Sequence, residues 1–222
     1  MSCFILALKK VVTKFYMLIL IVAATAPEIE PLTQYFGNKI DVLVTGAGMV
    51  PTAFALGRHF TKPKYDLVLN LGIAGSFDRA IQPGYVVEVT EDTFAETGAE
   101  DDEHFIPITT LGFGENTYRP TTSLSEVNSN FHLQKARAIT VNTVHGNEAS
   151  IKKVQERLNP QLESMEGAAF FYACQQMGMA CMQIRAVSNY VEKRNREAWQ
   201  IGLAIKNLNT FAIDLIDKII ND

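Results

Sequence analysis

The chain has 222 residues, of which 47% are hydrophobic and 20% are charged. That composition is typical of a globular domain, and it excludes a disordered chain, a collagen-like repeat and a disulfide scaffold. The formal net charge is -4 and no basic block occurs, which argues against a protein that wraps nucleic acid. Three cysteines, Cys3, Cys174 and Cys181, lack paired or metal-ligand spacing, so we expect free thiols in a reducing cytoplasm.

The N-terminal apolar run from Phe15 to Ala26 allows two interpretations. Lysines precede it and small residues end it, as in a secretory signal peptide. Most of the same run, Met17–Ala24, also has the composition of a buried parallel strand and is too short to cross a bilayer. We favour the strand, because the chain that follows alternates strands with helices. Residues 1–16 are then an N-terminal extension, Met17 is a candidate biological start, and residues 17–222 form one domain.

The rest of the chain alternates predicted strands with predicted helices. In chain order these are a strand at 40–45, a helix at 50–60, strands at 66–72, 85–90 and 138–144, helices at 148–158 and 167–177, a strand at 180–187 and a helix at 196–220. The polar segment 91–122 is long for a connection, so we expect a functional or interface loop there. The alternation predicts an α/β fold of three layers, α/β/α, with helices on both faces of a mostly parallel mixed sheet.

In such sheets, ligands bind at the carboxyl ends of the strands. The candidate residues that follow predicted strands or open a helix are Glu28, the turns Gly46–Gly48 and Gly72–Ser76, His145, Met165, Glu166, Ser188 and Asn189. The first turn begins like a dinucleotide fingerprint, but Pro51 occupies the third glycine position, so no nicotinamide cofactor is expected. The four histidines lack metal-ligand spacing, so no metal is expected either.

Several of these residues also have purely structural interpretations. Glu166 could favour the dipole of the helix that it opens, or it could hold the hydroxyls of a diol. Arg185 lies within an apolar strand, where a buried guanidinium needs a carboxylate partner such as Glu28. Asn189 could form a turn, and His145 could be a structural histidine or a substrate contact.

Four short sequences occur together in one order, namely AATAPE at 23–28, LGIAG at 71–75, SMEGA at 164–168 and RAVSN at 185–189. Together they resemble the purine nucleosidase branch of the nucleoside phosphorylase superfamily, which includes methylthioadenosine/S-adenosylhomocysteine nucleosidases. The stretches 143–150 and 188–196 resemble more closely one group in that branch, the futalosine hydrolases of the alternative menaquinone pathway. The resemblance runs from about Met17 onward.

This resemblance implies a nucleoside phosphorylase-like fold and hydrolysis of an N-ribosidic bond through a ribosyl cation-like transition state. It assigns Glu28 as the base that activates water and Arg185 as the residue that positions both. Glu166 would hold the ribose hydroxyls, with Met165 packing on the sugar, and Asn189 would bind the departing purine. The other substrate-binding residues would be Ala74, Gly75, His145 and Ser188.

The chain departs from the adenine-specific enzymes of that branch at three places. Asn189 stands where they have an aspartate, and an amide cannot pass a proton but can donate hydrogen bonds to N7 and O6 of a 6-oxopurine. This favours hypoxanthine or guanine as the leaving base. Ile73 replaces a polar residue near the water, so the sequence leaves open whether Ser76 or a backbone amide helps to hold it. Ala149-Ser150 fills the place of the stacking aromatic. The candidates for stacking are then Phe94, Phe105 and Phe113.

A carboxylate at the end of the first strand would repel phosphate, so water is the expected nucleophile. We therefore expect a cytoplasmic homodimer or higher homo-oligomer that hydrolyses futalosine to hypoxanthine and dehypoxanthine futalosine, without a cofactor, nucleic acid or membrane partner. The open alternatives are a methylthioadenosine/S-adenosylhomocysteine nucleosidase, a purine nucleoside phosphorylase and a non-catalytic nucleoside-binding protein. Arg119, Arg194 or Arg196 could pair with the benzoate carboxylate of the 5′ substituent.

Overall fold

The computed structural model describes residues 17–61 and 64–221. Its strands are β1 (Ile19–Ala23), β2 (Asp41–Val44), β3 (Leu67–Ser76), β4 (Val86–Phe94), β5 (Gly98–Asp101), β6 (His104–Pro107), β7 (Thr117–Tyr118), β8 (Gln134–Thr140), β9 (Leu162–Ser164) and β10 (Cys181–Tyr190). Its helices are α1 (Ala26–Phe36), α2 (Met49–His59), α3 (Leu124–Val127), α4 (Glu148–Leu158), α5 (Gly167–Gln176) and α6 (Ile201–Asn221), with 3-10 turns at Gly37–Lys39 and Arg196–Ala198. The predicted N-terminal extension, residues 1–16, lies outside the described residues.

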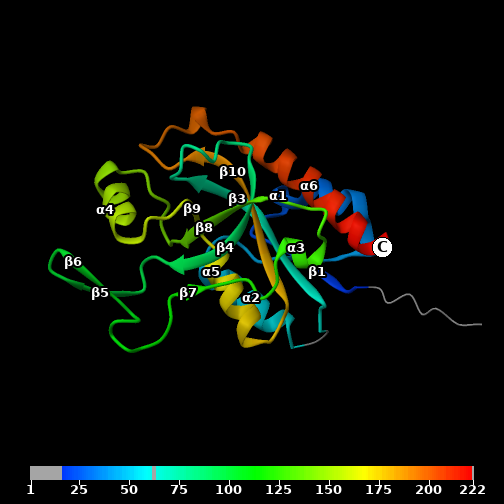
Figure 1. Ribbon diagram of the computed structural model, residues 1–222, viewed down its shortest axis with the longest axis horizontal. Coiled ribbons are helices and arrows are strands. Elements are labelled where there is room, and N and C mark those ends of the chain that lie inside the picture. Colours follow the sequence, from blue (N-terminus) through cyan, green and yellow to red (C-terminus); the bar gives the residue numbers. More distant parts are fainter. Residues whose placement is uncertain (1–16, 62–63, 222) are drawn as a thin grey trace, which may run out of the picture.

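A mixed sheet forms the centre of the molecule (Figure 1). Its order in the described chain is β10-β4-β8-β9-β3-β1-β2, with β7 beside β4. β3 also pairs with β10, so the sheet curls back on itself between these strands. The pairs β1–β2, β1–β3, β3–β10, β4–β8 and β8–β9 are parallel, whereas β4–β10, β3–β9 and β4–β7 are antiparallel. β1 is buried along its whole length, as its unbroken apolar sequence predicts.

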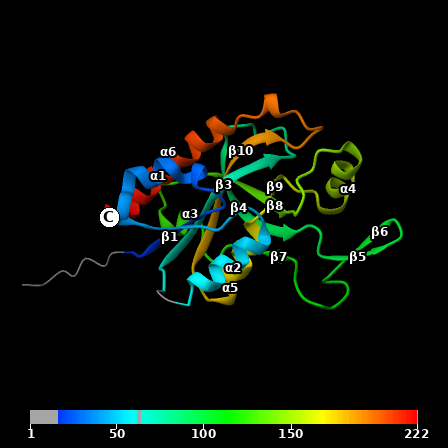
Figure 2. The same ribbon diagram turned by 180° about the vertical axis from the view of Figure 1, so that it is seen from behind.

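Two layers of helices cover the sheet. α1 and α6 lie together on one face, and α2 and α5 lie together on the other (Figures 1 and 2). Each layer has its own hydrophobic cluster, with Leu208 and Leu215 of α6 in the first and Phe170 and Phe171 of α5 in the second. This arrangement confirms the predicted three-layer α/β/α fold, and it leaves the carboxyl ends of the central strands together at one edge.

The segment 27–31 corrects one prediction. Its acidic residues and two prolines predict a loop at the end of the first strand, but the segment forms the beginning of α1. Pro27 lies at a position where a helix does not require a backbone N–H. Thr25 and Glu28 form a capping box that holds the first turn. The carboxylate of Glu28 is thereby fixed by a helix rather than carried on a loop.

The polar segment 91–122 is only partly irregular. β4 continues to Phe94, and the hairpin of β5 and β6 follows and stands away from the body of the molecule (Figure 1). Its predicted role as a functional or interface loop stays a prediction. Over residues 17–61 and 64–221, every helix is too short or too polar to cross a bilayer.

Candidate active site

A cavity of about 430 Å³ opens at the carboxyl ends of β1, β3 and β10. Eight of the nine predicted site residues line it, and these are Glu28, Ala74, Gly75, His145, Met165, Glu166, Ser188 and Asn189. They come from segments that are far apart in the sequence, and the fold brings them to one space. The ninth residue, Arg185, lies beneath this lining and is buried within β10.

Glu28 is held from two sides. Its Oε2 accepts hydrogen bonds from the backbone N–H of Thr25 at 2.9 Å and from the Thr25 hydroxyl at 2.8 Å. Its Oε1 accepts from the backbone N–H of Ile73, at the end of β3, at 3.1 Å. Glu28 is 8% exposed. The lone pairs of its carboxylate that accept no hydrogen bond from the protein are therefore the part available to a ligand in the cavity. The Ser76 hydroxyl donates to the carbonyl of Asp78 at 2.9 Å, and its part in holding water stays a prediction.

The backbone of Glu28 is tied to the last helix. Asn209 of α6 is buried, and its amide nitrogen donates to the carbonyl of Glu28 at 2.8 Å. Its amide oxygen accepts from the backbone N–H of Leu32 at 3.1 Å. The side chain thus bridges one turn of α1 next to Pro31, which has no N–H to donate. This bridge fixes the turn that carries the site carboxylate.

Arg185 lies close to Glu28 across Gly72. A methyl group added at Gly72 would lie 2.6 Å from Arg185 Nη1 and 3.0 Å from Glu28 Oε1, so only glycine fits between them. Burial lowers the pKa of Arg185, and the charges of Glu166, Glu28 and Asp92 oppose that effect. Its Nε and Nη2 have no hydrogen-bond partner among the described residues. The guanidinium is therefore a buried cation that several carboxylates share.

Glu166 occupies the N-cap position of α5, but its side chain does not cap that helix. Its Oε1 instead accepts from the backbone N–H of Gly48 at 2.8 Å. Gly48 has a φ of 99°, a left-handed conformation that favours glycine. The Gly46–Gly48 turn, a candidate from sequence despite its broken fingerprint, therefore holds Glu166 at the cavity wall.

Asp92 is a site-associated residue that the sequence does not reveal. It is fully buried in β4, accepts from Thr140 Oγ1 at 2.8 Å and accepts from Gln183 Nε2 at 3.1 Å. Burial raises its pKa from 3.8 to about 6, although these hydrogen bonds and the charge of Arg185 lower it. A methyl group at Gly167 would collide with Asp92 and Gln183. Position 167, directly after Glu166, must therefore be glycine, because any side chain there would overlap the Asp92 carboxylate.

Gly75 lies in the middle of a row across three strands. It pairs in register with Asn189 of β10 on one side and with Glu163 of β9 on the other. Paired residues project to the same face of a sheet, and Asn189 and Glu163 both line the cavity. A methyl group at Gly75 would lie 2.9 Å from Val191 Cγ2 and 3.4 Å from Asn189 Nδ2, so the Val191 side chain closes the middle of this row and only glycine fits there.

Both ends of this row carry polar groups. Asn189 Oδ1 accepts from Ser188 Oγ at 2.7 Å, and its Nδ2 donates to the carbonyl of Tyr190 at 2.9 Å, which leaves a second N–H of that amide. Glu163 accepts from the backbone N–H of His145 at 2.9 Å and from its ring Nδ1. Burial raises the pKa of Glu163, and these hydrogen bonds oppose that effect.

Several predicted contacts lie away from the cavity. Phe94, Phe105 and Phe113 are not among the residues that line it. Trp199 supplies an aromatic wall instead, with the guanidinium of Arg194 5.0 Å from its ring centre. Arg119 pairs with Glu91 at 2.8 Å outside the cavity, and Arg196 does not line it. Arg194 is the one member of the predicted arginine set at this site.

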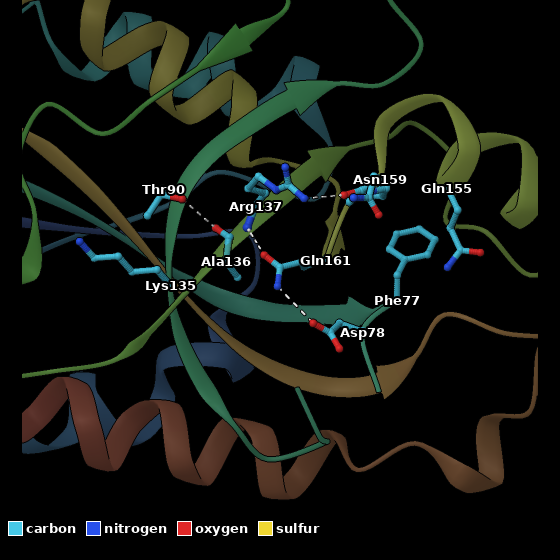
Figure 3. Close-up of a pocket in the computed structure, with 10 residues that line it drawn as sticks. Phe77, Asp78, Thr90, Lys135, Ala136, Arg137, Gln155, Asn159 and Gln161 are labelled. Atoms are coloured by element: carbon cyan, nitrogen blue, oxygen red, sulfur yellow. Dashed lines mark hydrogen bonds between the residues drawn. The ribbon is translucent and has the colours of Figure 1, made fainter. Parts of the chain in front are cut away.

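A second cavity of about 470 Å³ contains none of the predicted site residues. Its side chains bond to one another, as Figure 3 shows: Gln161 accepts from the backbone N–H of Arg137 at 3.1 Å and donates to Asp78 at 3.1 Å. Arg137 also donates to the carbonyl of Asn159 at 3.2 Å. The polar groups around this cavity are therefore largely satisfied without a ligand.

Comparisons with known proteins give one consistent result. The family model described as the phosphorylase superfamily matches residues 20–221. The chain is 38% identical over 148 residues to a futalosine hydrolase of Streptomyces coelicolor, a match across 65% of this chain but only 62% of that relative. It is 31% identical over 175 residues to a futalosine hydrolase of Acidothermus cellulolyticus, across 76% of this chain and 71% of the relative.

The fold is also that of a solved nucleosidase. A mutant MTAN of Helicobacter pylori, crystallised with 5′-methylthioadenosine in its active site, superposes with a TM-score of 0.79 over 92% of this chain and 100% of that chain. The sequence identity is 16%. At that identity the likeness establishes the shared fold, and the predicted nucleoside phosphorylase-like architecture is confirmed.

Proposed function

This chain belongs to the phosphorylase superfamily, and we propose that it is a nucleosidase that hydrolyses the N-ribosidic bond of futalosine. The products are hypoxanthine and dehypoxanthine futalosine, and the reaction serves menaquinone biosynthesis. Futalosine hydrolases are the curated relatives that it matches. The observation that carries the proposal is the convergence of Glu28, Glu166 and Asn189 on one cavity with an arginine buried behind them.

In the proposed reaction, Glu28 takes a proton from water while the water oxygen attacks C1′. Its carboxylate is oriented by Thr25 and the N–H of Ile73, which leaves its remaining lone pairs for the water. Glu166 accepts hydrogen bonds from the ribose hydroxyls and its negative charge stabilises the cationic sugar. Arg185 touches neither the sugar nor the base. It is a positioning residue that balances the buried carboxylates through its charge.

Water rather than phosphate is the nucleophile in this proposal. A phosphate dianion would have to lie against the Glu28 carboxylate, and like charges at contact distance repel strongly in a partly buried site. Arg194 is the one arginine among the described residues that line the cavity. It lies against the ring of Trp199, rather than beside Glu28, where a phosphate would have to bind. Turnover that is independent of phosphate is the corresponding expectation, and a phosphate requirement would assign the chain to the phosphorylases.

The substrate is tested by measuring released base from futalosine, inosine and 5′-methylthioadenosine with purified protein. Asn189 donates hydrogen bonds but cannot protonate a base, which suits a 6-oxopurine. We expect hypoxanthine release from futalosine to be fastest. Faster adenine release from 5′-methylthioadenosine would favour the alternative nucleosidase, and tight nucleoside binding without release would indicate a binding protein.

We further propose that Arg194 and Trp199 form the wall that receives the 5′ substituent. Trp199, Ile201 and Ile205 offer an aromatic and aliphatic surface, and Arg194 offers a guanidinium next to it. Futalosine carries a benzoate at this end, and a guanidinium suits a carboxylate. Arg194→Gln should raise KM for futalosine, by about tenfold for the loss of one charged hydrogen bond, without changing KM for inosine. An equal rise for both nucleosides would contradict this role.

We also propose that the protein forms a homo-oligomer and is located in the cytoplasm. Val50 and Phe54 of α2 are 73% and 66% exposed, and together with Tyr172 of α5 they line an apolar hollow. Exposed apolar faces of this kind are buried by partners, and a second copy of this chain is the proposed partner; light scattering would measure it. Cys174 and Cys181 are buried, unbridged neighbours, which suits a reducing compartment.

A further inference from the structure

The leaving base needs a proton that Asn189 cannot provide. When the C1′–N9 bond breaks, its electron pair stays on the base, and a 6-oxopurine anion leaves poorly unless a ring nitrogen is protonated. An amide side chain donates hydrogen bonds but does not release a proton. If the proposed nucleosidase activity holds, another group at the base end of the cavity must act as the general acid.

His145 is placed for this task. Its ring Nδ1 lies against the Glu163 carboxylate, and Phe77 packs edge-on to the ring at a centroid distance of 6.2 Å. Nδ1 therefore carries the hydrogen in the pair with Glu163, and Nε2 is the ring atom left to face a ligand. Within the described chain, Nε2 of His145 has no hydrogen-bond partner, and the residue lines the cavity.

The strand register places this pair opposite Asn189. Glu163 and Asn189 flank Gly75 in the same row, one on each neighbouring strand. Neighbouring strands lie about 4.8 Å apart, so the two backbones are about 10 Å apart, and both side chains line the same cavity. A base bound by the Asn189 amide in this cavity then lies in the space that His145 also lines.

We propose that His145 is the general acid for the departing base and that Glu163 is its positioning residue, a role that rests on the proposed nucleosidase activity. The imidazolium gives its Nε2 proton to a ring nitrogen of the base as the C1′–N9 electrons pass to that base. Water forms the new bond to C1′ and loses its proton to Glu28. Solvent then returns a proton to the imidazole and removes one from Glu28, so the cycle is balanced.

The decisive experiment compares two leaving groups. Futalosine releases a base that needs a proton, whereas 4-nitrophenyl β-D-ribofuranoside releases a stable anion that needs none. His145→Gln should lower kcat on futalosine by about 10²- to 10⁴-fold, the usual contribution of a general acid, and leave the nitrophenyl riboside at the wild-type rate. Equal losses on both substrates, or no loss on futalosine, would overturn the proposal.

The pH dependence with futalosine provides an independent readout. The alkaline limb of kcat/KM reports the general acid of the free enzyme, and it should be absent in His145→Gln and displaced to lower pH in Glu163→Gln. Two other charged residues lie near the pair. Glu96 acts on Glu163 through its charge. Arg194 lies next to Gly146, the neighbour of His145, because its Cβ would be 3.5 Å from a methyl group added at Gly146. An alkaline limb unchanged in both variants would contradict the assignment.

His59→Gln is the matched control, because His59 bonds to the Tyr65 hydroxyl at 2.8 Å and is not part of the cavity lining. It should leave both substrates and the pH profile unchanged. Thermal melting of all three variants checks that each is folded. Wild-type protein that leaves futalosine intact would refute the proposed function itself, whereas an active wild type with uniform losses in the variants would refute only the role of His145.

Discussion

The two cavities have similar volumes, about 430 and 470 Å³, but their polar groups are organised differently. Around the second cavity, Arg137, Gln161 and Asp78 bond mainly to each other and to nearby backbone. Around the first, Glu28 and Glu166 are fixed by backbone N–H groups and keep lone pairs directed to open space. The difference teaches that volume does not identify a site. A site is identified instead by polar side chains that are fixed by hydrogen bonds to the protein and still have free hydrogen-bonding capacity on the cavity side.

Removing the charge of a held carboxylate tests this contrast most strongly. Glu28→Gln should lower turnover of futalosine by about 10²- to 10⁴-fold, or roughly 3–5 kcal/mol, because an amide cannot take a proton from water. Steady-state release of hypoxanthine measures it. Gln155 is an exposed residue of the second cavity. The control variant Gln155→Ala should therefore keep the wild-type rate. Near wild-type turnover in Glu28→Gln would remove its assigned role.

The buried acid behind the first cavity should make stability depend on pH. The pKa of Asp92 is raised from 3.8 to about 6, mainly by burial, so its stabilising contribution is full below pH 4 and is lost as the pH rises through 6. Wild type should lose about 3 kcal/mol relative to Asp92→Asn across that window, at about 1.4 kcal/mol per pKa unit. Urea unfolding of both proteins at pH 4, 5, 6 and 7 measures the difference.

Thr140 and Gln183 can still bond to an asparagine at position 92, because Gln183 Oε1 has no partner among the described residues and can accept from the new amide. A constant difference between the two proteins from pH 4 to pH 7 would show that Asp92 stays ionised in the fold.

The smallest effect should come from the second cavity. Gln161→Ala removes the acceptor of the Arg137 N–H and the donor to Asp78. Each such bond contributes about 1 kcal/mol to the free energy of unfolding, and these groups lie close enough to solvent to be partly compensated. Chemical denaturation should therefore show a loss of about 1 kcal/mol, with unchanged kcat/KM for futalosine. A large fall in kcat/KM would mean that the two cavities are not functionally separate.

Sequence predicts the first cavity better than it predicts what stands behind it. Glu28, Glu166 and Asn189 follow strands or open a helix, and in a parallel sheet those positions converge by geometry. Local patterns therefore suffice to bring them together, even though the segment around Glu28 is helical rather than a loop. The helix is hard to recognise in the sequence, because it contains two prolines. The capping box that begins it also uses Glu28, which the sequence marks as a catalytic candidate.

The supporting residues depend on long-range register, which local patterns do not contain. Asp92 belongs to the site only because β4 pairs with both β8 and β10 and so brings Thr140 and Gln183 to it. Glu163 lies in a three-residue strand that has no periodicity to detect. A glutamate two residues before a Met-Glu pair is the one available clue, and nothing in the sequence connects it to His145.

Asn209 has a consequence for the order in which the protein folds. It joins α6 to the turn of α1 that carries Glu28, and α6 is synthesised after every strand of the sheet. Domains begin to form while the ribosome is still adding residues. A nascent chain can therefore assemble its sheet while the Glu28 turn is still unsecured, and the proposed site is completed only when α6 docks.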